Sequence, residues 1–480
     1  MRHWPFNLKL TAILLLATAL RFPILARQSI AFDEGFSLAV SSKPLPFLLK
    51  AILSDGVHPP LFYVLFKGAL ALFGTTEFGA RFFTAVLSIL GVAAIFLLGK
   101  TLFGQRVGLA AALLLAVNPV HIWLAQEARM YSLLSLLATL NFWFFWQILH
   151  RPRRKYYCGL WLTATLLITT HYFGLLIPAV QFFYLALRLK KHPHTLIPWT
   201  LAQFAAGLVL LPWLIATALR PVKSFGIAFL VRPTPADMLF SVWNMVAGFE
   251  PSLWWAALPA LAVAALGVIL AWKHPAPPTL LLSLWGFAPV VLVWAVSQQR
   301  SFYADRYLSF TIPALMLLIA AGWAKVSVGR RIIIPLMGIF LLANHWLLLS
   351  SPLFWKDDWR EAAKFIAANE QPGDVIVLRS PHIELPFDYY YHGQSERRLA
   401  TFNLDVYPVA ETIGDAPRVW MVMPYTRRPT HYPSQPLTDA SVWVLDDDVP
   451  EWQQFVESHP ILIHRRFLGV EVWRVKNARH

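Results

Sequence analysis

LKLTAILLLATALRFPILARQSIAFDEG, residues 8–35, joins a long apolar run to two adjacent acids. The run has the length that a bilayer core requires, about 20 apolar residues per helix. It resembles a signal peptide in outline, but no small-x-small cleavage site follows, so we interpret it as a retained signal-anchor span. Asp33 and Glu34 come next, at the start of a long first loop. Because acids are costly in or near hydrocarbon, their position indicates a function.

The composition is typical of an integral membrane protein. Of 480 residues, 57% are hydrophobic and 14% are charged, and the mean hydropathy is +0.53. The formal net charge is +15. Its basic residues fall mainly in short loops between apolar runs, which favours topology signals and contacts to anionic lipid or phosphate over nucleic-acid binding. A single cysteine, Cys158, excludes a disulfide within the chain.

Apolar runs predict a mainly α membrane protein with about eleven transmembrane helices. The predicted spans are residues 8–25, 79–99, 107–124, 131–149, 157–174, 175–190, 196–219, 252–272, 279–297, 307–324 and 331–350. With a cytoplasmic N-terminus, the inner loops collect Lys and Arg, as in the run Arg151–Lys155, and the longer outer loops collect most acids. The chain is therefore expected in a plasma membrane.

The first outer loop, residues 26–78, is not a simple linker. Residues 44–52 and 60–73 are apolar or amphipathic and are interrupted by Lys50 and Lys67. They are typical of helices that lie at the membrane interface. The second segment alternatively forms a short span, which would change the topology.

From Pro352 the composition changes, which predicts two domains, residues 1–350 in the membrane and 351–480 outside it. Residues 357–366 read as an amphipathic helix, and residues 375–378, 419–423, 442–445 and 470–475 read as strands. The alternation predicts a small α/β domain on the outer face.

The acid pair Asp33 and Glu34 is the first candidate for chemistry. A carboxylate can accept the proton of a hydroxyl that becomes a nucleophile. Since adjacent residues do not easily enter one pocket, we assign one as base and the other as support. The alternative is that these acids cap an interfacial helix.

Two further motifs of the first loop could bind phosphate. His58 precedes two prolines that begin a helix, and a helix N-terminus attracts anions. Arg81 opens the next span, where a guanidinium can hold a phosphate by two hydrogen bonds. The structural alternatives are an incidental histidine and an interfacial arginine that extends to lipid headgroups.

A dense polar cluster, residues 121–131, separates two apolar runs on the outer side. In a helix, Glu127 and Tyr131 would share one face, and so would Gln126 and Arg129. A short connection needs neither acid nor base, so a functional role is favoured over a local Glu–Arg pair.

His171 and Arg306 lie at predicted outer ends of spans. His171 is a candidate ligand for a metal or phosphate, although a lone histidine there is more often simply hydrogen-bonded. Arg306 is a candidate for an anionic substrate, with Asp305 as its local partner. No spacing gives a strong metal signal, which leaves a divalent metal ion open, and no Walker-type loop is present. No nucleotide or redox cofactor is expected.

The order and spacing of these motifs resemble the GT-C superfamily of membrane glycosyltransferases, in particular the family 39 and 83 group of protein O-mannosyltransferases and aminoarabinose transferases. The resemblance is carried by Asp33-Glu34, His58-Pro59-Pro60-Leu61, Phe78-Gly79-Ala80-Arg81 and Gln126-Glu127-Ala128-Arg129-Met130-Tyr131, and it covers residues 8–175. It implies a GT-C type helical bundle.

The resemblance also implies an activity, the inverting transfer of a sugar from a polyprenyl-phosphate donor to an acceptor outside the cytoplasm. It implies Asp33 as catalytic base with Glu34 as its companion, Arg81 against the lipid phosphate, and Glu127 as a second acid. The C-terminal tail is unlike the insert of eukaryotic protein mannosyltransferases. A bacterial glycan or lipid in the cell envelope is therefore as plausible an acceptor as protein.

Two other classes remain as alternatives. A transporter or flippase of a lipid-linked sugar should place polar residues at mid-bilayer in broken, repeated halves. In this chain they gather at one face and no halves recur, which favours the enzyme. A structural membrane scaffold would not explain why Asp33, Arg81, Glu127 and Arg129 cluster on the outer side.

Overall fold

A computed structural model describes residues 8–219, 232–248, 254–273, 276–351, 355–379, 381–399, 412–424 and 457–477. The chain divides into two compact units. The first contains the residues up to Leu25 and Val40–Ser350. The second contains Ala26–Ala39 together with most of the chain from Ser351 onward. Asp33 and Glu34 thus belong to the unit of the small C-terminal domain, although the sequence grouped them with the membrane domain.

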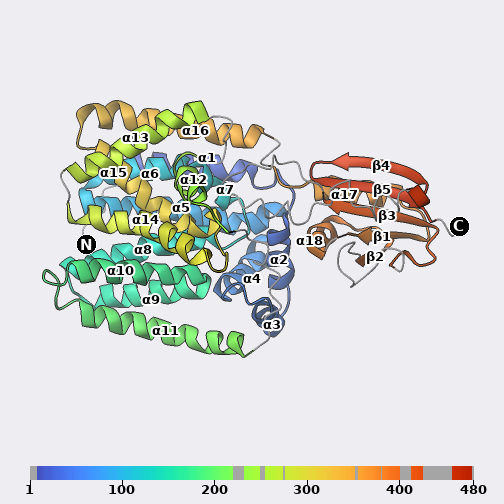
Figure 1. The fold of residues 1–480 in the computed structure, drawn as a ribbon, viewed down its shortest axis with the longest axis horizontal. Helices are drawn as coiled ribbons and strands as arrows, with labels where there is room; N and C mark the ends of the chain where they lie inside the picture. Colours follow the sequence, from blue (N-terminus) through green and yellow to red (C-terminus); the bar gives the residue numbers. More distant parts are fainter. Residues whose placement is uncertain are drawn as a thin grey trace. The chain divides into compact units, whose positions relative to one another are not determined.

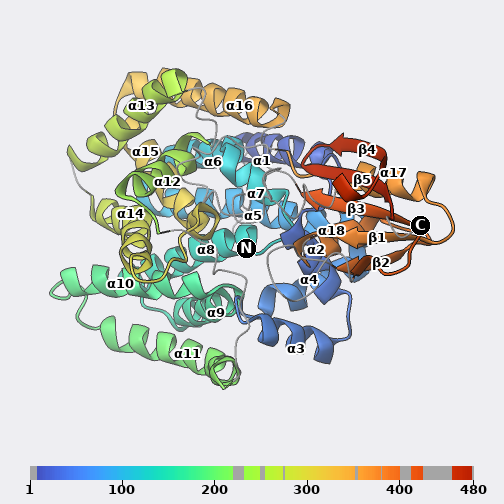
Figure 2. The same ribbon diagram turned by 45° about the vertical axis from the view of Figure 1, so that its right-hand side comes forward.

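The first unit is helical (Figures 1 and 2). Its elements are α1 (Leu8–Arg21), η1 (Phe22–Ile24), the end of α2 (Phe32–Ser41), α3 (Leu45–Asp55), α4 (Leu61–Phe73), α5 (Glu77–Phe103), α6 (Gln105–Val117), α7 (Pro119–Ala125), α8 (Tyr131–His150), α9 (Arg154–Thr170), η2 (Tyr172–Leu175), α10 (Leu176–Leu187), α11 (Leu196–Ala218), α12 (Pro235–Ala247), α13 (Trp254–Lys273), α14 (Pro277–Ser297), η4 (Asp305–Thr311), α15 (Ile312–Trp323), η5 (Gly329–Ile333) and α16 (Ile334–Ser350). Both views show α9 and α11 side by side.

Six helices among the described residues are long and apolar enough to cross a membrane, or seven if a bent pair counts as one span. They are Glu77–Phe103, Tyr131–His150, Leu196–Ala218, Pro277–Ser297, Asp305–Trp323 and Gly329–Ser350. The predicted number of eleven is not confirmed. The first predicted span contains a helix of only 14 residues, which ends at Arg21 because Pro23 follows and lacks a backbone N–H. The alternative short span, α4, has 13 residues.

The bent pair is α6 and α7, whose axes differ by 61°. Asn118 ends α6 and caps α7, because its side chain accepts a hydrogen bond from the backbone N–H of His121 at 2.9 Å. Pro119 occupies the first turn of α7, where its missing N–H costs nothing. The sequence predicted one span over residues 107–124 and did not predict the bend within it.

A buried arginine ties four helices together at this bend. The Arg21 guanidinium at the end of α1 donates to the Ser88 hydroxyl of α5 at 2.8 Å and to the Ala116 carbonyl of α6 at 3.0 Å. It also donates to Nδ1 of His121 in α7, at 2.9 Å. A charge buried this deeply requires such partners, so the contacts hold the bent pair against α1 and α5.

Glycines allow the closest helix contacts. A Cβ on Gly322 of α15 would lie 1.7 Å from the carbonyl oxygen of Gly267 in α13. The Trp323 indole N–H donates across the same contact to the Val263 carbonyl at 2.8 Å. Small residues at such crossings let backbones pack where helices have no hydrophobic drive to associate.

The second unit contains a five-stranded sheet with strand order β2-β1-β3-β5-β4 (Figure 1). Its strands are β1 (Asp374–Leu378), β2 (Glu396–Leu399), β3 (Arg418–Pro424), β4 (Ile461–Phe467) and β5 (Val470–Lys476), and its helices are most of α2, α17 (Trp359–Asn369) and α18 (Pro381–Tyr390). The strands β2, β1 and β3 are parallel to one another, β5 pairs antiparallel with β3, and β4 pairs antiparallel with β5. Three predicted strands and the predicted helix are confirmed. The predicted strand 442–445 lies outside the described residues.

The central strands β1 and β3 are buried on both faces of the sheet. On one face, Ile376 and Trp420 pack with Ala363 and Ile366 of α17 and with Phe387 of α18. The neighbouring strand residues, such as Val375 and Val419, form the core of the opposite face. The alternation follows from the two-residue period of a strand, and it explains why these strands read as continuous apolar runs.

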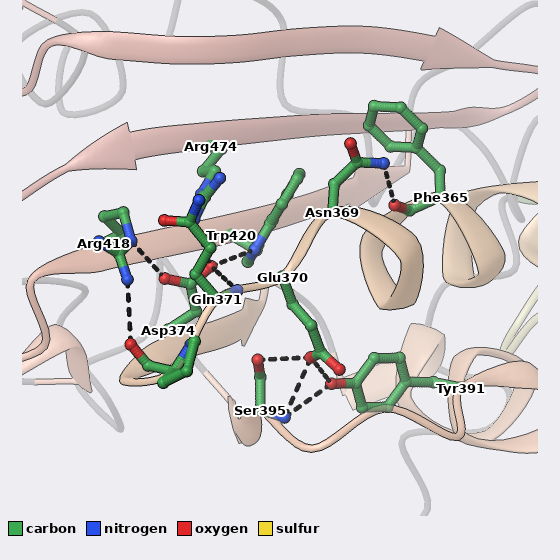
Figure 3. Close-up of polar contacts among 11 residues, drawn as sticks. Phe365, Asn369, Glu370, Gln371, Asp374, Tyr391, Ser395, Arg418, Trp420 and Arg474 are labelled. Carbon is green, nitrogen blue, oxygen red and sulfur yellow. Dashed lines mark hydrogen bonds and ion pairs between the residues drawn. The ribbon is translucent and has the colours of Figure 1, made fainter.

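Two acids, the buried Asp374 and the half-buried Glu370, organise the polar contacts of this domain (Figure 3). Asp374 accepts hydrogen bonds from Arg418 at 2.6 Å, Arg474 at 2.8 Å and the Trp420 indole at 3.0 Å. Glu370 accepts from the Tyr391 hydroxyl and from the Ser395 hydroxyl and backbone. Burial alone would raise the pKa of Glu370, but these hydrogen bonds outweigh it and lower the pKa below its usual value.

Candidate functional site

The predicted site residues fall in both units. Asp33 and Glu34 lie in the first turn of α2, in the second unit. Glu34 is 1% exposed, and its Oε2 accepts from the Ala31 backbone N–H at 3.0 Å and from the Lys356 ammonium at 2.7 Å. Asp33 is half-buried. Glu34 therefore caps the start of α2, as the structural alternative expected of these acids, while Asp33 remains partly exposed to solvent.

Four basic side chains of the first unit form what we call the cationic cluster, namely His58, Arg129, His171 and Arg306. His58 directly precedes the two prolines before α4, and Arg129 lies in the turn between α7 and α8. His171 ends α9, and Arg306 lies in η4. The sequence named all four as candidates without predicting that four separate connections would bring them together.

Tyr307 lies at the centre of the cationic cluster. Its ring centroid is 5.3 Å from that of His171 and 6.5 Å from that of His58, and the Arg306 guanidinium lies 5.6 Å from it. The two imidazole centroids are 5.3 Å apart. Sequence reasoning missed Tyr307 because it read as one aromatic among many in a predicted span. Its only signal was the adjacent Arg306.

The electrostatics of the cluster favour an anion. Burial, followed by the charge of Arg129 and contributions from His171 and Arg306, lowers the pKa of His58 well below its usual value. His58 is therefore neutral at pH 7, and the permanent positive charge is that of the arginines. The Arg129 guanidinium also donates to the Tyr63 hydroxyl at 3.1 Å, which fixes its orientation.

Two ring nitrogens of the cluster are buried and have no hydrogen-bond partner within the described part of the chain. Nδ1 of His171 accepts from the Phe173 backbone N–H at 3.0 Å, so in the neutral ring the proton is on Nε2, which is one of these two atoms. The other is Nδ1 of His58. A buried polar atom without a partner is costly, and a bound oxyanion would accept the proton of His171 Nε2.

Residues 126–130 form a turn between α7 and α8, so the expectation of helical spacing across Gln126–Tyr131 is wrong. The helix α7 begins at Pro119, after the Asn118 cap, and ends at Ala125. The next helix, α8, begins only at Tyr131. Gln126 donates back to the Ile122 carbonyl at 3.3 Å, and the Arg129 backbone N–H donates to the Glu127 carbonyl at 2.7 Å. The Tyr131 ring lies 6.3 Å from Tyr307, which places Tyr131 beside the cationic cluster.

Arg81 lies in the first turns of α5, which Thr76 caps by accepting from the Gly79 N–H at 3.2 Å. Its side chain is 1% exposed, and its Nη1 donates to the Leu25 carbonyl at 2.7 Å. It is therefore enclosed by protein, and the alternative of an arginine that extends to headgroups is wrong. The contact holds the end of the first helical segment on α5.

Within the ranges that the structure describes, no group of three or more His, Cys, Asp or Glu side chains is arranged to hold a metal ion. The donor set of the cationic cluster is two imidazoles and two guanidiniums. Guanidiniums have no lone pair for a metal, so this set suits an oxyanion better than a cation.

Comparison with known proteins relates this geometry to a fold. Residues 57–216 match the family model described as dolichyl-phosphate-mannose-protein mannosyltransferase. That range includes His58, Arg81, Arg129 and His171 but not Asp33. No curated protein matches the chain.

Several solved structures are similar. ArnT from Cupriavidus metallidurans in the apo state has a TM-score of 0.64 at 14% identity, and ArnT bound to undecaprenyl phosphate has 0.65 at 13%. Both matches cover 97% of each chain. The apo oligosaccharyltransferase of Archaeoglobus fulgidus has a TM-score of 0.56 at 11% identity, over 84% of this chain and 65% of that chain.

These identities are low, so the likeness shows a shared fold, and that fold is the one of GT-C glycosyltransferases. The resemblance that the motifs indicated is thus confirmed at the level of the fold. In the ArnT matches the likeness extends over nearly the whole chain, so it includes regions where the sequence offered only a hydrophobic pattern.

Proposed function

We propose that this protein is an inverting glycosyltransferase that moves a sugar from a polyprenyl-phosphate donor to a glycan, lipid or protein acceptor. The observation that carries the proposal is the cationic cluster, whose two buried ring nitrogens have no hydrogen-bond partner among the described residues, in a chain whose fold matches ArnT over 97% of its length. The reaction takes place at the outer face of a bacterial inner membrane.

In the proposed reaction, an acceptor hydroxyl attacks the anomeric carbon as the bond from that carbon to the phosphate oxygen breaks. Asp33 accepts the hydroxyl proton as general base. Glu34 supports it by holding the start of α2, since its own oxygen is engaged by Lys356. The leaving group is polyprenyl phosphate, whose low pKa means that it needs positive charge more than a proton.

The cationic cluster supplies that charge. Arg129 and Arg306 neutralise the departing phosphate, and His171 donates a hydrogen bond from Nε2. We assign Arg81 to the donor side through its position at the start of α5. Gln126, Glu127 and Tyr131 are proposed substrate contacts, with Glu127 as the second acid. No step of this reaction requires a nucleotide or redox cofactor.

The test is sugar transfer by the purified full chain in nanodiscs, with a panel of polyprenyl-phosphate sugars and glycan, lipid and peptide acceptors. Wild type should release polyprenyl phosphate with at least one donor. Asp33→Asn should lower kcat by about 10²–10⁴-fold, the range of a lost general base. Asp55→Asn, at the end of α3, is the matched control.

Near-normal turnover by Asp33→Asn would exclude Asp33 as base. Carrier translocation in liposomes that survives Asp33→Asn, without any sugar transfer, would replace the enzyme by a transporter.

A further inference from the structure

We propose that the small C-terminal domain acts as the scaffold that positions Asp33, with Lys356 as the central positioning residue. The inference deepens the proposed function, because it rests on Asp33 as the base. It concerns only contacts within the second unit, which contains both residues 26–39 and the C-terminal sheet.

Lys356 makes two contacts with the acid-bearing segment. Its ammonium pairs with Glu34 Oε2 at 2.7 Å, and the two side chains are 9% and 1% exposed. Its backbone N–H donates to the Gln28 side-chain oxygen at 3.2 Å. If this buried ion pair separated, each charge would be left desolvated and without compensation. The paired arrangement is therefore strongly favoured.

Further hydrogen bonds fix the residues just before the acids. The Ser29 hydroxyl donates to Asp358 at 3.1 Å, and the Ile30 backbone N–H donates to the Tyr390 hydroxyl of α18 at 2.8 Å. The Arg360 guanidinium donates to the Ala26 carbonyl at 3.1 Å. These pairs are separated by 329 to 360 residues in sequence, so local structure does not create them.

Gly35 fixes the segment just after the acids. A Cβ at this position would lie 3.2 Å from the Leu385 Cβ and 3.3 Å from the Pro386 backbone nitrogen. The start of α2 therefore packs closely against α18, and even a Cβ at this position would require its neighbours to move. Since Ile30 and Glu34–Gly35 are both anchored, the backbone at Asp33 is held from both sides, while its side chain remains half-exposed.

Hydrogen exchange measured by mass spectrometry on the full chain in nanodiscs tests the scaffold without reference to activity. Lys356→Met should increase the exchange rate of residues 28–36 by at least about tenfold, while Lys356→Arg should keep it near wild type. Lys364→Met is the matched control, because Lys364 forms an exposed ion pair with Glu361 on the same helix, α17. Equal exchange in wild type and Lys356→Met would overturn the scaffold.

A steric variant provides an independent route if the charge variants fail to fold. Gly35→Leu should release the same segment, whereas Gly68→Leu in α4, where a Cβ meets nothing within 4 Å, should not. Unchanged protection of residues 28–36 in Gly35→Leu would contradict the packing on α18.

Kinetics then distinguish a positioning role from a merely structural one. Lys356→Met should lower kcat by about 10–100-fold with KM for the donor nearly unchanged, because a displacement near 1 Å suffices for such a loss. Lys356→Arg, which keeps the positive charge, should retain most of the wild-type kcat. Faster hydrogen exchange of residues 28–36 in Lys356→Met, with unchanged kcat, would overturn the positioning role. Full activity of Asp33→Asn would instead refute the proposed function and leave the exchange result standing.

Discussion

Arg306 carries a permanent charge beside Tyr307, the ring that lies against both imidazoles of the cationic cluster. Its guanidinium lies over Tyr307, and its charge acts on His58 from a different connection of the fold. A guanidinium in such a setting is weakly hydrated and keeps its charge, so it can meet a phosphate at little desolvation cost.

We expect Arg306→Gln to raise the Kd for polyprenyl phosphate by about 10–100-fold, since a lost charged hydrogen bond is worth about 1.5–3 kcal/mol. Microscale thermophoresis with the purified chain measures this directly. Arg151→Gln, in an exposed loop, serves as the control and should leave the Kd unchanged. Identical affinity in wild type and Arg306→Gln would remove Arg306 from the donor site.

At the scale of elements, the contact between α13 and α15 depends on two glycines. Gly322→Ala should destabilise the protein by about 1–3 kcal/mol or more, because its Cβ would overlap the Gly267 carbonyl and force the helices apart. Unfolding in detergent, followed by tryptophan fluorescence, measures the change.

The control for that variant is Gly338→Ala in α16, where a Cβ meets nothing within 4 Å. Replacing glycine by alanine at an unobstructed position within a helix stabilises the helix by up to about 1 kcal/mol. Equal stability of both variants would show that the two helices do not meet at Gly322.

Sequence reasoning predicted those elements whose causes are local. The two prolines after His58 begin α4, and the apolar strands Val375–Leu378 and Val419–Met423 lie in the sheet. It did not predict the bend at Asn118-Pro119, which divides the predicted span 107–124 into α6 and α7. Sequence reasoning did not predict the pairing of Lys356 with Glu34. The two residues are 322 positions apart, and the local sequence around either one does not indicate its partner.

The candidate site shows the same division. Residue chemistry identified His58, Arg129, His171 and Arg306 one by one. Their meeting around Tyr307 depends on packing among α4, α8, α9 and η4, which periodicity does not encode. Tyr307 itself had no distinguishing pattern and became visible only as the common neighbour of the others.

At the scale of the whole molecule, the distribution of charge predicts orientation. Arg151–Lys155 should lie in the cytoplasm and the C-terminal domain outside, by the positive-inside rule. In a Cys158→Ser background, Glu457→Cys should react with a membrane-impermeant maleimide in intact spheroplasts. Arg153→Cys, equally exposed, should react only after permeabilisation. The reverse pattern would invert the proposed topology.

The pairing of the first loop with the last domain also orders events during biosynthesis. Glu34 leaves the ribosome 322 residues before Lys356, and at roughly 5–20 residues per second that interval is about 16–64 s. Throughout this time the segment that carries Asp33 has been made but its partners have not. A chain interrupted in any helix before Lys356 never acquires them, so the proposed base reaches its working position only after translation has passed α16.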